Sequence, residues 1–495
     1  RRKRLVGYLS TMTVAPFVAA LLIMLVPSNR PWLTRLIALG ASLVSFAISL
    51  VVLAGYSWQA GGFQFRETYQ WLPQFGVQVL LGVDGISVPM VFLNAIVLLT
   101  GTIVTFKIAD RPKEFYALFL VSVAGVFGVF CSVDLFVLFL TYDIAGLPMY
   151  ILIVAWGSTR KEYAAMKLAM MHVAGSLFVW VGMLAIYVQA GSKSFDLEFL
   201  AAQAQVLFPP AFQQIFFPVI FIGFGFLAAM WPLHTWSPDG HGAAPTAVSM
   251  VAAGVLMKLG AYGIIRVAVW LLPVGAQFWS PFFVTLGTIG AVYGGVMALA
   301  QRDFKFVIAN SSVSHMGYVI VGIATLSLAG MNGAILQMFS HGVMTALFFA
   351  MVGALYDQTH TREVGMFGGL ARTMPWFTGF FVIAALASLG LPGLSGFVAE
   401  LLIFLGAFQT YPVVGFLCIA TVALAATYML RMVARAFFGP INPQWTHLRD
   451  LLPAEWIAGV LLVATLVVVG VYPAPFLDMI NASAAPVIER VGGVR

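Results

Sequence analysis

The chain has 495 residues, of which 61% are hydrophobic and only 9% are charged, with a net charge of +7. Because a soluble globular protein carries roughly 25% charged residues, this composition excludes a water-soluble enzyme. The apolar runs are continuous rather than alternating, which excludes a transmembrane β-barrel and leaves the helix as the only structure that can span a bilayer.

The apolar runs predict an all-α polytopic membrane protein with about fourteen transmembrane helices. A span requires about 20 predominantly apolar residues, and the runs approach or exceed that length. An even number of spans places both termini on the same side of the membrane. In chain order the runs are 8–26, 33–55, 84–106, 115–131, 134–156, 167–190, 211–235, 243–270, 281–301, 305–327, 331–356, 375–408, 412–438 and 455–474.

The basic residues of the loops predict the orientation of the chain. One set of loops is rich in Lys and Arg, whereas the other contains few, such as Arg66 and Lys193. The richer set is expected to face the cytoplasm, so both termini are predicted outside, in the bacterial inner membrane or an equivalent energy-transducing membrane. The opening run from Arg1 to Arg4 opposes this orientation, but the summed loops outweigh it. The richer set contains Arg30, Lys107, Arg111, Lys113, Arg160, Lys161, Arg302, Lys305, Arg362, Arg372 and Arg449.

The sequence offers no residues typical of a redox centre. Cys131 and Cys418 lie far apart inside apolar runs, so neither a disulfide framework nor a cysteine-held iron–sulfur cluster is expected. Gly223 and Gly225 lie in the middle of a span rather than at a turn between a strand and a helix, which argues against a dinucleotide-binding motif. We therefore expect neither a cofactor nor a metal on this chain.

Prolines interrupt two spans, near Pro232 and near Pro392, and each break falls in the fourth span of a group of five. Ordinary proline kinks would be the simpler explanation, but interrupted segments at matching positions favour two inverted five-helix repeats with an ion path between them. The predicted divisions are N-terminal helices at 1–110, a first repeat at 111–272, a second repeat at 273–440, and a C-terminal helix and tail at 441–495.

Four ionisable residues lie near the middle of predicted spans: Asp143, Lys258, His341 and Glu400. A charge at the centre of a bilayer costs roughly 2.5–3.5 kcal/mol even on lenient scales, so each residue needs a partner, a water path or a function. Lysine can change its protonation state where arginine cannot, and histidine titrates near neutral pH. A purely structural role is the alternative for each, but the row favours lateral proton or cation transfer.

Two histidines and a carboxylate, His234, Asp239 and His241, cluster beside the first break. They could be interpreted as a metal site, but their seven-residue spacing across prolines matches no known ligand pattern. A polar loop mouth is the favoured interpretation.

Three further residues could support the row. Lys305 resembles a charge at the membrane edge, and His315 could extend a hydrated path. Arg266 lies eight residues after Lys258, about two helical turns away, where its fixed charge would favour a neutral lysine.

Several long motifs resemble the antiporter-like membrane subunits of respiratory complex I, in that family's order and over nearly the whole chain. Glu400 stands where the M-type (NuoM-like) subunit has glutamate and the L- and N-types have lysine, and Thr345 stands where the L-type has lysine. The likeness is therefore to the M-type. The motifs lie at Leu81–Ser87, Trp231–His241 with Ala244–Thr246, Lys258–Arg266, Asp303–Lys305 with Ser312–Gly317, and Leu391–Glu400.

The resemblance implies a proton-translocating subunit of an NADH-quinone oxidoreductase, with two half-channels joined by a central hydrophilic axis. Lys258 would be the central proton donor and acceptor, His341 the relay and Glu400 the residue at the outward path. FMN, iron–sulfur clusters and quinone would lie on other subunits. The implied partners are lipid and other membrane subunits of the complex, namely the N-type and L-type antiporter-like subunits, with a second M-like subunit as an additional candidate. No nucleic acid is expected.

Two positions depart from the family pattern. Asp143 replaces the usual glutamate of the fifth helix, and Leu227 replaces the lysine that normally lies five residues before the proline of the Pro-Leu-His motif. The usual carboxylate–lysine pair therefore lacks its lysine, which implies a modified or weakened input half-channel or a changed partner for Asp143. Three alternatives follow. They are a subunit of a multi-subunit Na⁺/H⁺ antiporter or membrane-bound hydrogenase, a divergent additional M-like subunit with weakened or no conduction, and a structural spacer without conduction.

Overall fold

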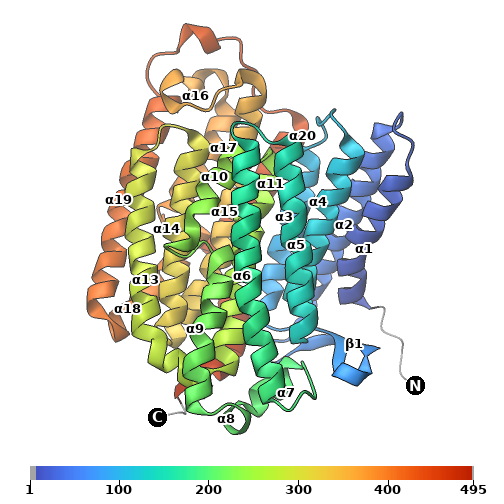
Figure 1. Ribbon diagram of the computed structural model, residues 1–495. Coiled ribbons are helices and arrows are strands. Elements are labelled where there is room, and N and C mark those ends of the chain that lie inside the picture. Colours follow the sequence, from blue (N-terminus) through green and yellow to red (C-terminus); the bar gives the residue numbers. More distant parts are fainter. Residues whose placement is uncertain (1–6, 493–495) are drawn as a thin grey trace.

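The computed structural model describes residues 7–492 as a bundle of long helices (Figure 1). Thirteen crossings in this range are long and apolar enough to span a membrane. The shorter helices α17 (Pro375–Ser388) and α18 (Ser395–Thr410) together form a fourteenth. The predicted all-α polytopic fold class is therefore confirmed, and counting this broken crossing gives the predicted total of fourteen. The basic run from Arg1 to Arg4 lies outside the described residues.

The long helices follow the apolar runs of the sequence, within a few residues at most ends. One crossing, Thr246–Val269, consists of α11 (Thr246–Val251), a π-helical turn (Ala252–Leu256), α12 (Met257–Gly263) and a second π-helical turn (Ile264–Val269). The others are α1 (Tyr8–Leu25), α2 (Pro31–Gly55), α3 (Ser87–Val104), α4 (Pro112–Cys131), α5 (Leu135–Trp156), α6 (Lys161–Gln189), α9 (Pro210–Leu227), α13 (Pro273–Ala300), α14 (Phe304–Ala324), α15 (Leu328–Thr359), α19 (Pro412–Phe437) and α20 (Pro453–Val471). Shorter helices are α7 (Leu197–Ala202), α8 (Ala204–Leu207), α10 (Trp236–Ala243) and α16 (Leu370–Thr373).

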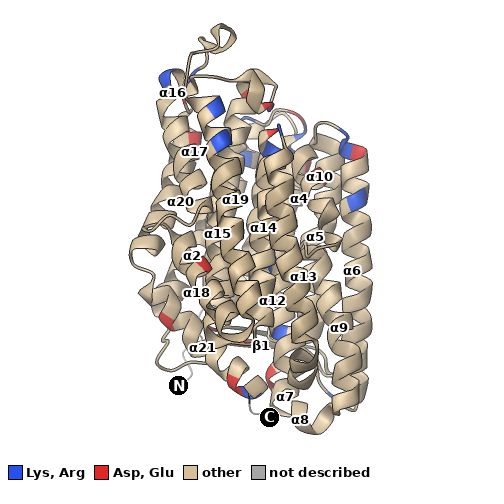
Figure 2. Ribbon diagram, turned by 90° about the vertical axis from the view of Figure 1, so that its left-hand side faces the viewer, with Lys and Arg blue, Asp and Glu red and all other residues tan. Residues whose placement is uncertain are grey.

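Both ends of the described chain lie at the same end of the bundle, as an even number of spans requires (Figure 1). Charged residues gather at the two ends of the helices, with long uncharged stretches between them (Figure 2). This distribution of charged residues is typical of a protein whose middle lies in the hydrocarbon core of a membrane.

A β-hairpin at the end of the bundle near α7 is the one departure from an all-helical fold (Figure 1). Its antiparallel strands are β1 (Gln64–Leu72) and β2 (Val77–Val83), joined through Gly76 with φ +69°. The sequence predicts no element here, because residues 56–83 lie between two apolar runs. The correction has a physical reason, because β1 alternates polar and apolar residues outside the apolar runs. The backbone N–H of Gln78 donates to the Asp134 carboxylate at the start of α5.

The C-terminal segment expected to be a tail is an amphipathic helix, α21 (Ala474–Gly492). Its buried face includes Phe476, Ile480 and Val487, which pack on the bundle. The backbone N–H of Gly85 donates to Ser483 Oγ at 2.8 Å, and a Cβ at Gly85 would collide with the α21 backbone. The helix is therefore fastened to the loop before α3 and does not form another span.

Both predicted breaks are present in the structure. The first separates α9 from α10 by a non-helical stretch and a 3₁₀ turn at Leu233–Thr235, around Pro232. The second separates α17 from α18, where Gly390 and Gly393 adopt φ of +65° and +93°, a backbone conformation that only glycine adopts readily. Each break leaves helix ends inside the bundle, where side chains can meet.

The same cap occurs twice, at opposite ends of the bundle. Asp134 accepts hydrogen bonds from two backbone N–H groups at the start of α5 and forms a β-bridge with Asp196, after α6. Asp303 caps the start of α14 in the same way and forms a β-bridge with Glu363, after α15. The second helix of each five-helix group thus begins with the same device.

Candidate proton path

Lys258 lies at the centre of a crossing that is buried along its whole length. Its side chain is fully buried in α12, between the two π-helical turns. A π-helical turn leaves backbone groups without their usual partners and often marks a functional site. Here the Lys258 ammonium donates to the carbonyl of Ala253 in the first of these turns.

His341 of α15 is the side-chain partner of Lys258. The Nζ atom of Lys258 lies 2.6 Å from Nδ1 of His341. Because an ammonium has no acceptor, Nδ1 must accept when the lysine carries its full charge, and a proton on Nδ1 requires a neutral amine. The two groups therefore share protons between them instead of each holding a full complement.

His315 of α14 continues the row beyond His341. The two imidazole rings lie 5.3 Å apart between centroids. Nδ1 of His315 lies 3.2 Å from Oε1 of Glu400, and its Nε2 lies 3.1 Å from the hydroxyl of Ser388. Both ring nitrogens thus have polar neighbours, as a group that accepts a proton on one side and releases it on the other requires.

The second break brings Glu400 to His315. Ser388 ends α17 and Glu400 lies in α18, so the interrupted helix provides two polar groups on either side of one imidazole. Gln337 of α15 donates to Oε1 of Glu400 at 3.3 Å. The predicted residues Lys258, His341 and Glu400 therefore form one buried row, completed by His315.

Asp143 lies apart from this row. Its Oδ1 accepts a hydrogen bond from the Ser176 hydroxyl at 2.5 Å, and its side chain is 30% exposed on the outer face of α5 and α6. Within residues 7–492 no hydrogen bond or ion pair joins Asp143 to Lys258. The structure thus separates the predicted residues into an inner row and one carboxylate at the side.

The three polar residues at the first break do not converge on one point. The His234 ring packs against Tyr293, Asp239 forms an ion pair with Lys167, and the His241 ring packs against Phe349. In the described part of the chain, no group of three His, Cys, Asp or Glu residues could hold a metal ion. The predicted polar loop mouth is also absent from the described residues, because His234 and His241 are buried and His241 lies within helix α10.

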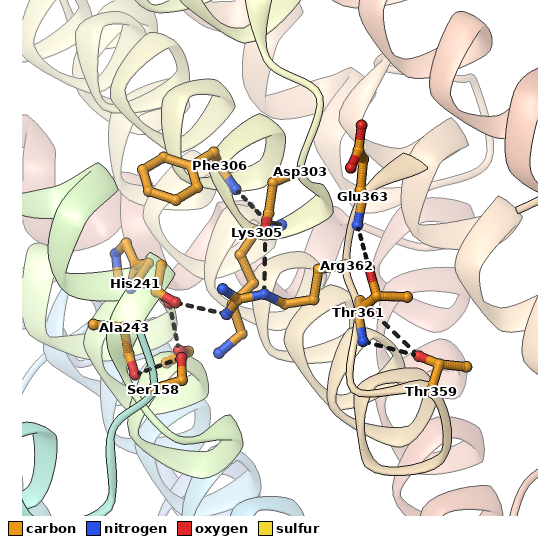
Figure 3. A network of polar contacts seen from close by, with 12 residues as sticks. Ser158, His241, Ala243, Asp303, Lys305, Phe306, Thr359, Thr361, Arg362 and Glu363 are labelled. Carbon is orange, nitrogen blue, oxygen red and sulfur yellow. Dashed lines mark hydrogen bonds and ion pairs between the residues drawn. The ribbon is translucent and has the colours of Figure 1, made fainter. Parts of the chain in front are cut away.

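Lys305 is buried, rather than exposed at a membrane edge. It lies beside Asp303 and Arg362 (Figure 3). Its Nζ donates to the carbonyl of Ala244 at 2.6 Å. The guanidinium of Arg362 donates to the carbonyl of Gly242 and forms an ion pair with Asp303 at 3.2 Å (Figure 3). These contacts hold the end of α10 against the start of α14.

A pocket of about 320 Å³ lies beside Lys305, and its lining includes Lys107, Asp357 and Thr246. Nζ of Lys107, in the loop after α3, lies 2.7 Å from Oε1 of Glu455 and pairs with Asp357 as well. Burial alone would lower the pKa of Lys107, but these two carboxylates outweigh it and the pKa is raised. The pocket wall therefore has a lysine, Lys107, whose charged form is stabilised by two carboxylates, and it also includes the buried Lys305.

Arg266 does not act on Lys258 as an unopposed charge. It forms a buried ion pair with Asp84, which also accepts from the backbone N–H groups of Ile86 and Ser87. Its guanidinium lies over the rings of Phe63 and Tyr262. The pair thus joins the middle of the bundle to the loop between β2 and α3.

The sequence interpretation missed His172, Ser388 and Gln337, all of which contact predicted residues. Serine and glutamine within apolar runs are too common in membrane helices to single out. His172 carried a usable signal, because it is one of only seven histidines in the chain and lies four residues before Ser176, on the same helix face.

Comparison with known proteins identifies the family of the chain. Residues 132–426, from the start of the α5 cap to α19, match the family model described as the transmembrane part of NADH:quinone oxidoreductases and Mrp antiporters. The chain belongs to this family. The matched range contains both breaks and all four predicted proton-path residues.

Curated relatives resemble the chain over nearly its full length. It is 36% identical to NAD(P)H-quinone oxidoreductase chain 4 2 of Thermosynechococcus vestitus, covering 98% of this chain and 92% of the relative. It is 35% identical to NAD(P)H-quinone oxidoreductase chain 4 of Gloeobacter violaceus, covering 98% and 96%. These names agree with the predicted M-type resemblance, which is confirmed.

Solved structures of the family have the same architecture. A chain of respiratory complex I from Thermus thermophilus superimposes with a TM-score of 0.89 at 27% identity, covering 97% of this chain and 99% of that one. A chain of the Mrp complex from Dietzia superimposes with a TM-score of 0.86 at 18% identity, covering 98% of each. Because the identity to the Mrp chain is only 18%, this similarity is evidence for the fold alone.

Proposed function

We propose that this family member is the proton-translocating, antiporter-like subunit of a complex-I-type NAD(P)H-quinone oxidoreductase. The observation that carries the proposal is the buried row of Lys258, His341, His315 and Glu400. Polar atoms lie 2.6 Å apart in the first pair and 3.2 Å apart in the last, and the two imidazole centroids between them are 5.3 Å apart. The curated relatives are named as chains of such an oxidoreductase, and the likeness extends over almost the entire chain.

The row suits proton transfer because every member can gain and lose a proton. A proton leaves the Lys258 ammonium for Nδ1 of His341 along the 2.6 Å contact, and the amine stays neutral until it is reloaded. The two imidazoles, whose ring centroids lie 5.3 Å apart, pass a proton toward Glu400 by a small ring movement or an intervening water, since Nε2 of His341 has no hydrogen-bond partner within residues 7–492. The Glu400 carboxylate then accepts the proton from Nδ1 of His315.

Residues 111–272 and 273–440 form the two inverted repeats of this proposal. The matched caps at Asp134 and Asp303, at opposite ends of the bundle, support it, as do the breaks in the fourth helix of each group. The basic loops lie at the end opposite the hairpin, which supports an orientation with that end in the cytoplasm and both termini outside.

The proposed subunit takes no part in electron transfer itself. FMN, iron–sulfur clusters and quinone are assigned to other subunits of the complex, so the chain is the membrane part of a redox-driven translocase. Its proposed neighbours are the N-type and L-type antiporter-like subunits, with a second M-like subunit as an additional candidate.

A subunit of a Na⁺/H⁺ antiporter is the second candidate, because the family model covers Mrp antiporters and an Mrp chain has the same fold. Copurification distinguishes the two candidates: an oxidoreductase subunit is isolated with iron–sulfur proteins, and an antiporter subunit is not. A purely structural spacer is disfavoured by the buried row of titratable residues from Lys258 to Glu400.

The test of the proposed function is Lys258→Met in the assembled complex reconstituted into vesicles, with proton pumping and quinone reduction measured together. We expect pumping to fall at least about tenfold, as for loss of a proton-transfer group. Lys193→Met, in an exposed loop after α6, is the matched control and leaves pumping unchanged. Wild-type pumping in Lys258→Met would refute the proposal.

A further inference from the structure

Asp143 lies in an environment that a lone carboxylate would not tolerate. It is the ninth residue of the 22-residue helix α5 and borders a groove of about 360 Å³ between α5 and α6. The groove is lined mostly by apolar side chains, among them Phe139, Leu147 and Trp180. Because a charge at this depth costs several kcal/mol without a partner, a basic or hydrogen-bonding group must lie on the inner side of Asp143.

His172 of α6 is that group. Its Nε2 atom lies 3.5 Å from Oδ1 of Asp143, and its side chain is only 2% exposed, whereas that of Asp143 is 30% exposed. The ring is stacked on Tyr142 with centroids 5.1 Å apart. Neither ring nitrogen of His172 has a hydrogen-bond partner within residues 7–492. The His172 imidazole is buried, has no other polar partner in the described residues and faces the partly exposed Asp143 carboxylate. It is therefore arranged to exchange a proton with that carboxylate.

The fold makes room for this imidazole. A Cβ atom at Gly146 of α5, three residues after Asp143, would collide with the His172 ring. Ser176, one turn beyond His172, donates to the same Oδ1 and fixes the orientation of the carboxylate. Gly146 of α5 and Ser176 of α6 therefore both support the contact between His172 and Asp143.

Among the described residues, helices α9 and α10, which pack on α6, together contain one carboxylate and no lysine or arginine. Helix α9 contributes Phe224, which packs edge-on against Tyr142, and further along it has Leu227. Helix α10 contributes Asp239, which is paired with Lys167 of α6 at 2.6 Å. Besides Asp143, the titratable group of α5 that touches His172 is Tyr142.

We propose that His172 is the basic partner of Asp143 and that the two hold one exchangeable proton at the groove between α5 and α6. The O–H bond of the Asp143 carboxyl group breaks, an N–H bond forms at Nε2 of His172, and a carboxylate–imidazolium pair results. The reverse transfer restores the neutral pair. This inference rests on the proposed function, and it provides Asp143 with a partner although Leu227 cannot be one.

The test replaces His172 in the assembled complex and follows pumping as a function of pH. His172→Gln keeps a polar side chain that cannot take up a proton, and we expect pumping to fall about tenfold. His172→Lys restores a base whose ordinary pKa is about four units higher, and we expect pumping to return with its pH dependence displaced to higher pH. His447→Gln, in an exposed loop, is the matched control.

Infrared titration of the same complexes provides a readout that does not depend on turnover. The band of the Asp143 carboxyl group is the one missing in Asp143→Asn. We expect the pH at which it disappears to change in His172→Gln, and an unchanged value would overturn the proposal. Wild-type pumping by His172→Gln across the pH range would also overturn it. If Lys258→Met does not pump while His172→Gln pumps normally, only the His172 proposal fails and the proposed function stands.

Discussion

Nζ of Lys258 lies 2.6 Å from Nδ1 of His341, and both side chains are buried in the centre of the bundle. At this distance the two groups compete for the same proton, because only one of the facing atoms can carry it along the line between them. When the proton moves from Lys258 to His341, the lysine becomes the acceptor of the hydrogen bond between them instead of its donor. The contact is therefore a point at which the charge state of one helix is transmitted to another.

The relay role of His341 predicts that a polar but non-titrating side chain will not replace it. His341→Gln keeps an acceptor for Lys258 but cannot carry a proton onward, so we expect pumping to fall about tenfold in the assembled complex. Pumping is measured in vesicles against His360→Gln, whose histidine is exposed after α15. Equal pumping by the two variants would remove His341 from the path.

Glu400 predicts a difference between two conservative substitutions. Glu400→Gln preserves the size of the side chain and its hydrogen bonds with Gln337, but it cannot ionise. We expect it to lose most of the pumping, whereas Glu400→Asp retains part of it, since the carboxylate remains near His315. The comparison is made at equal amounts of assembled complex. Faster pumping by the Glu400→Gln complex than by the Glu400→Asp complex would mean that Glu400 acts through packing alone.

The buried pair of Asp84 and Arg266 predicts an effect on stability. Asp84→Asn leaves the guanidinium without its counter-charge, and breaking a buried ion pair on one side costs about 3–5 kcal/mol. We expect a lower unfolding temperature of the isolated complex by thermal denaturation. Asp84→Asn combined with Arg266→Met removes both charges and restores part of the loss. A double variant less stable than Asp84→Asn would contradict this account.

Asp134 predicts a dependence of stability on pH. Burial raises the pKa of this carboxyl group to about 6, although backbone N–H groups of Val137, Gln78 and Phe136 lower it in part. A raised pKa means that the folded protein binds the proton more tightly than the unfolded chain, whose value is about 3.9. The contribution to stability is therefore present below about pH 4 and is lost as the pH rises through about 6.

Asp134→Asn tests this relationship, since asparagine caps a helix as well as aspartate does. We expect the unfolding temperature of the variant to change less between pH 4 and pH 7 than that of the wild type. Thermal denaturation at matched ionic strength measures both. An identical change in the two proteins would exclude Asp134 as the titrating group.

Much of the architecture follows from the sequence because the bilayer imposes it. Long apolar runs without alternation can only be helices, and the prolines at Pro232 and Pro392 mark the breaks directly. The hairpin and α21 were missed, since both lie outside the apolar runs and are held by contacts with distant segments, such as Ser483 with Gly85.

The site was predictable only in part for a related reason. Lys258, His341 and Glu400 are conspicuous as ionisable residues in the middle of apolar runs. The pairing of His315 with Glu400 depends on the second break, which turns two short helices around one imidazole. The approach of His172 to Asp143 depends on Gly146, whose importance is visible only when α5 and α6 are packed together.

The most direct test of the central claim is Lys258→Arg in the reconstituted complex, with protons pumped per electron as the readout. Arginine keeps the positive charge and the hydrogen-bond donors of lysine but does not release its proton in proteins. The row of proton carriers predicts that Lys258→Arg pumps as poorly as Lys258→Met, despite the retained charge. A wild-type ratio in Lys258→Arg would contradict the account, because a fixed positive charge would then suffice.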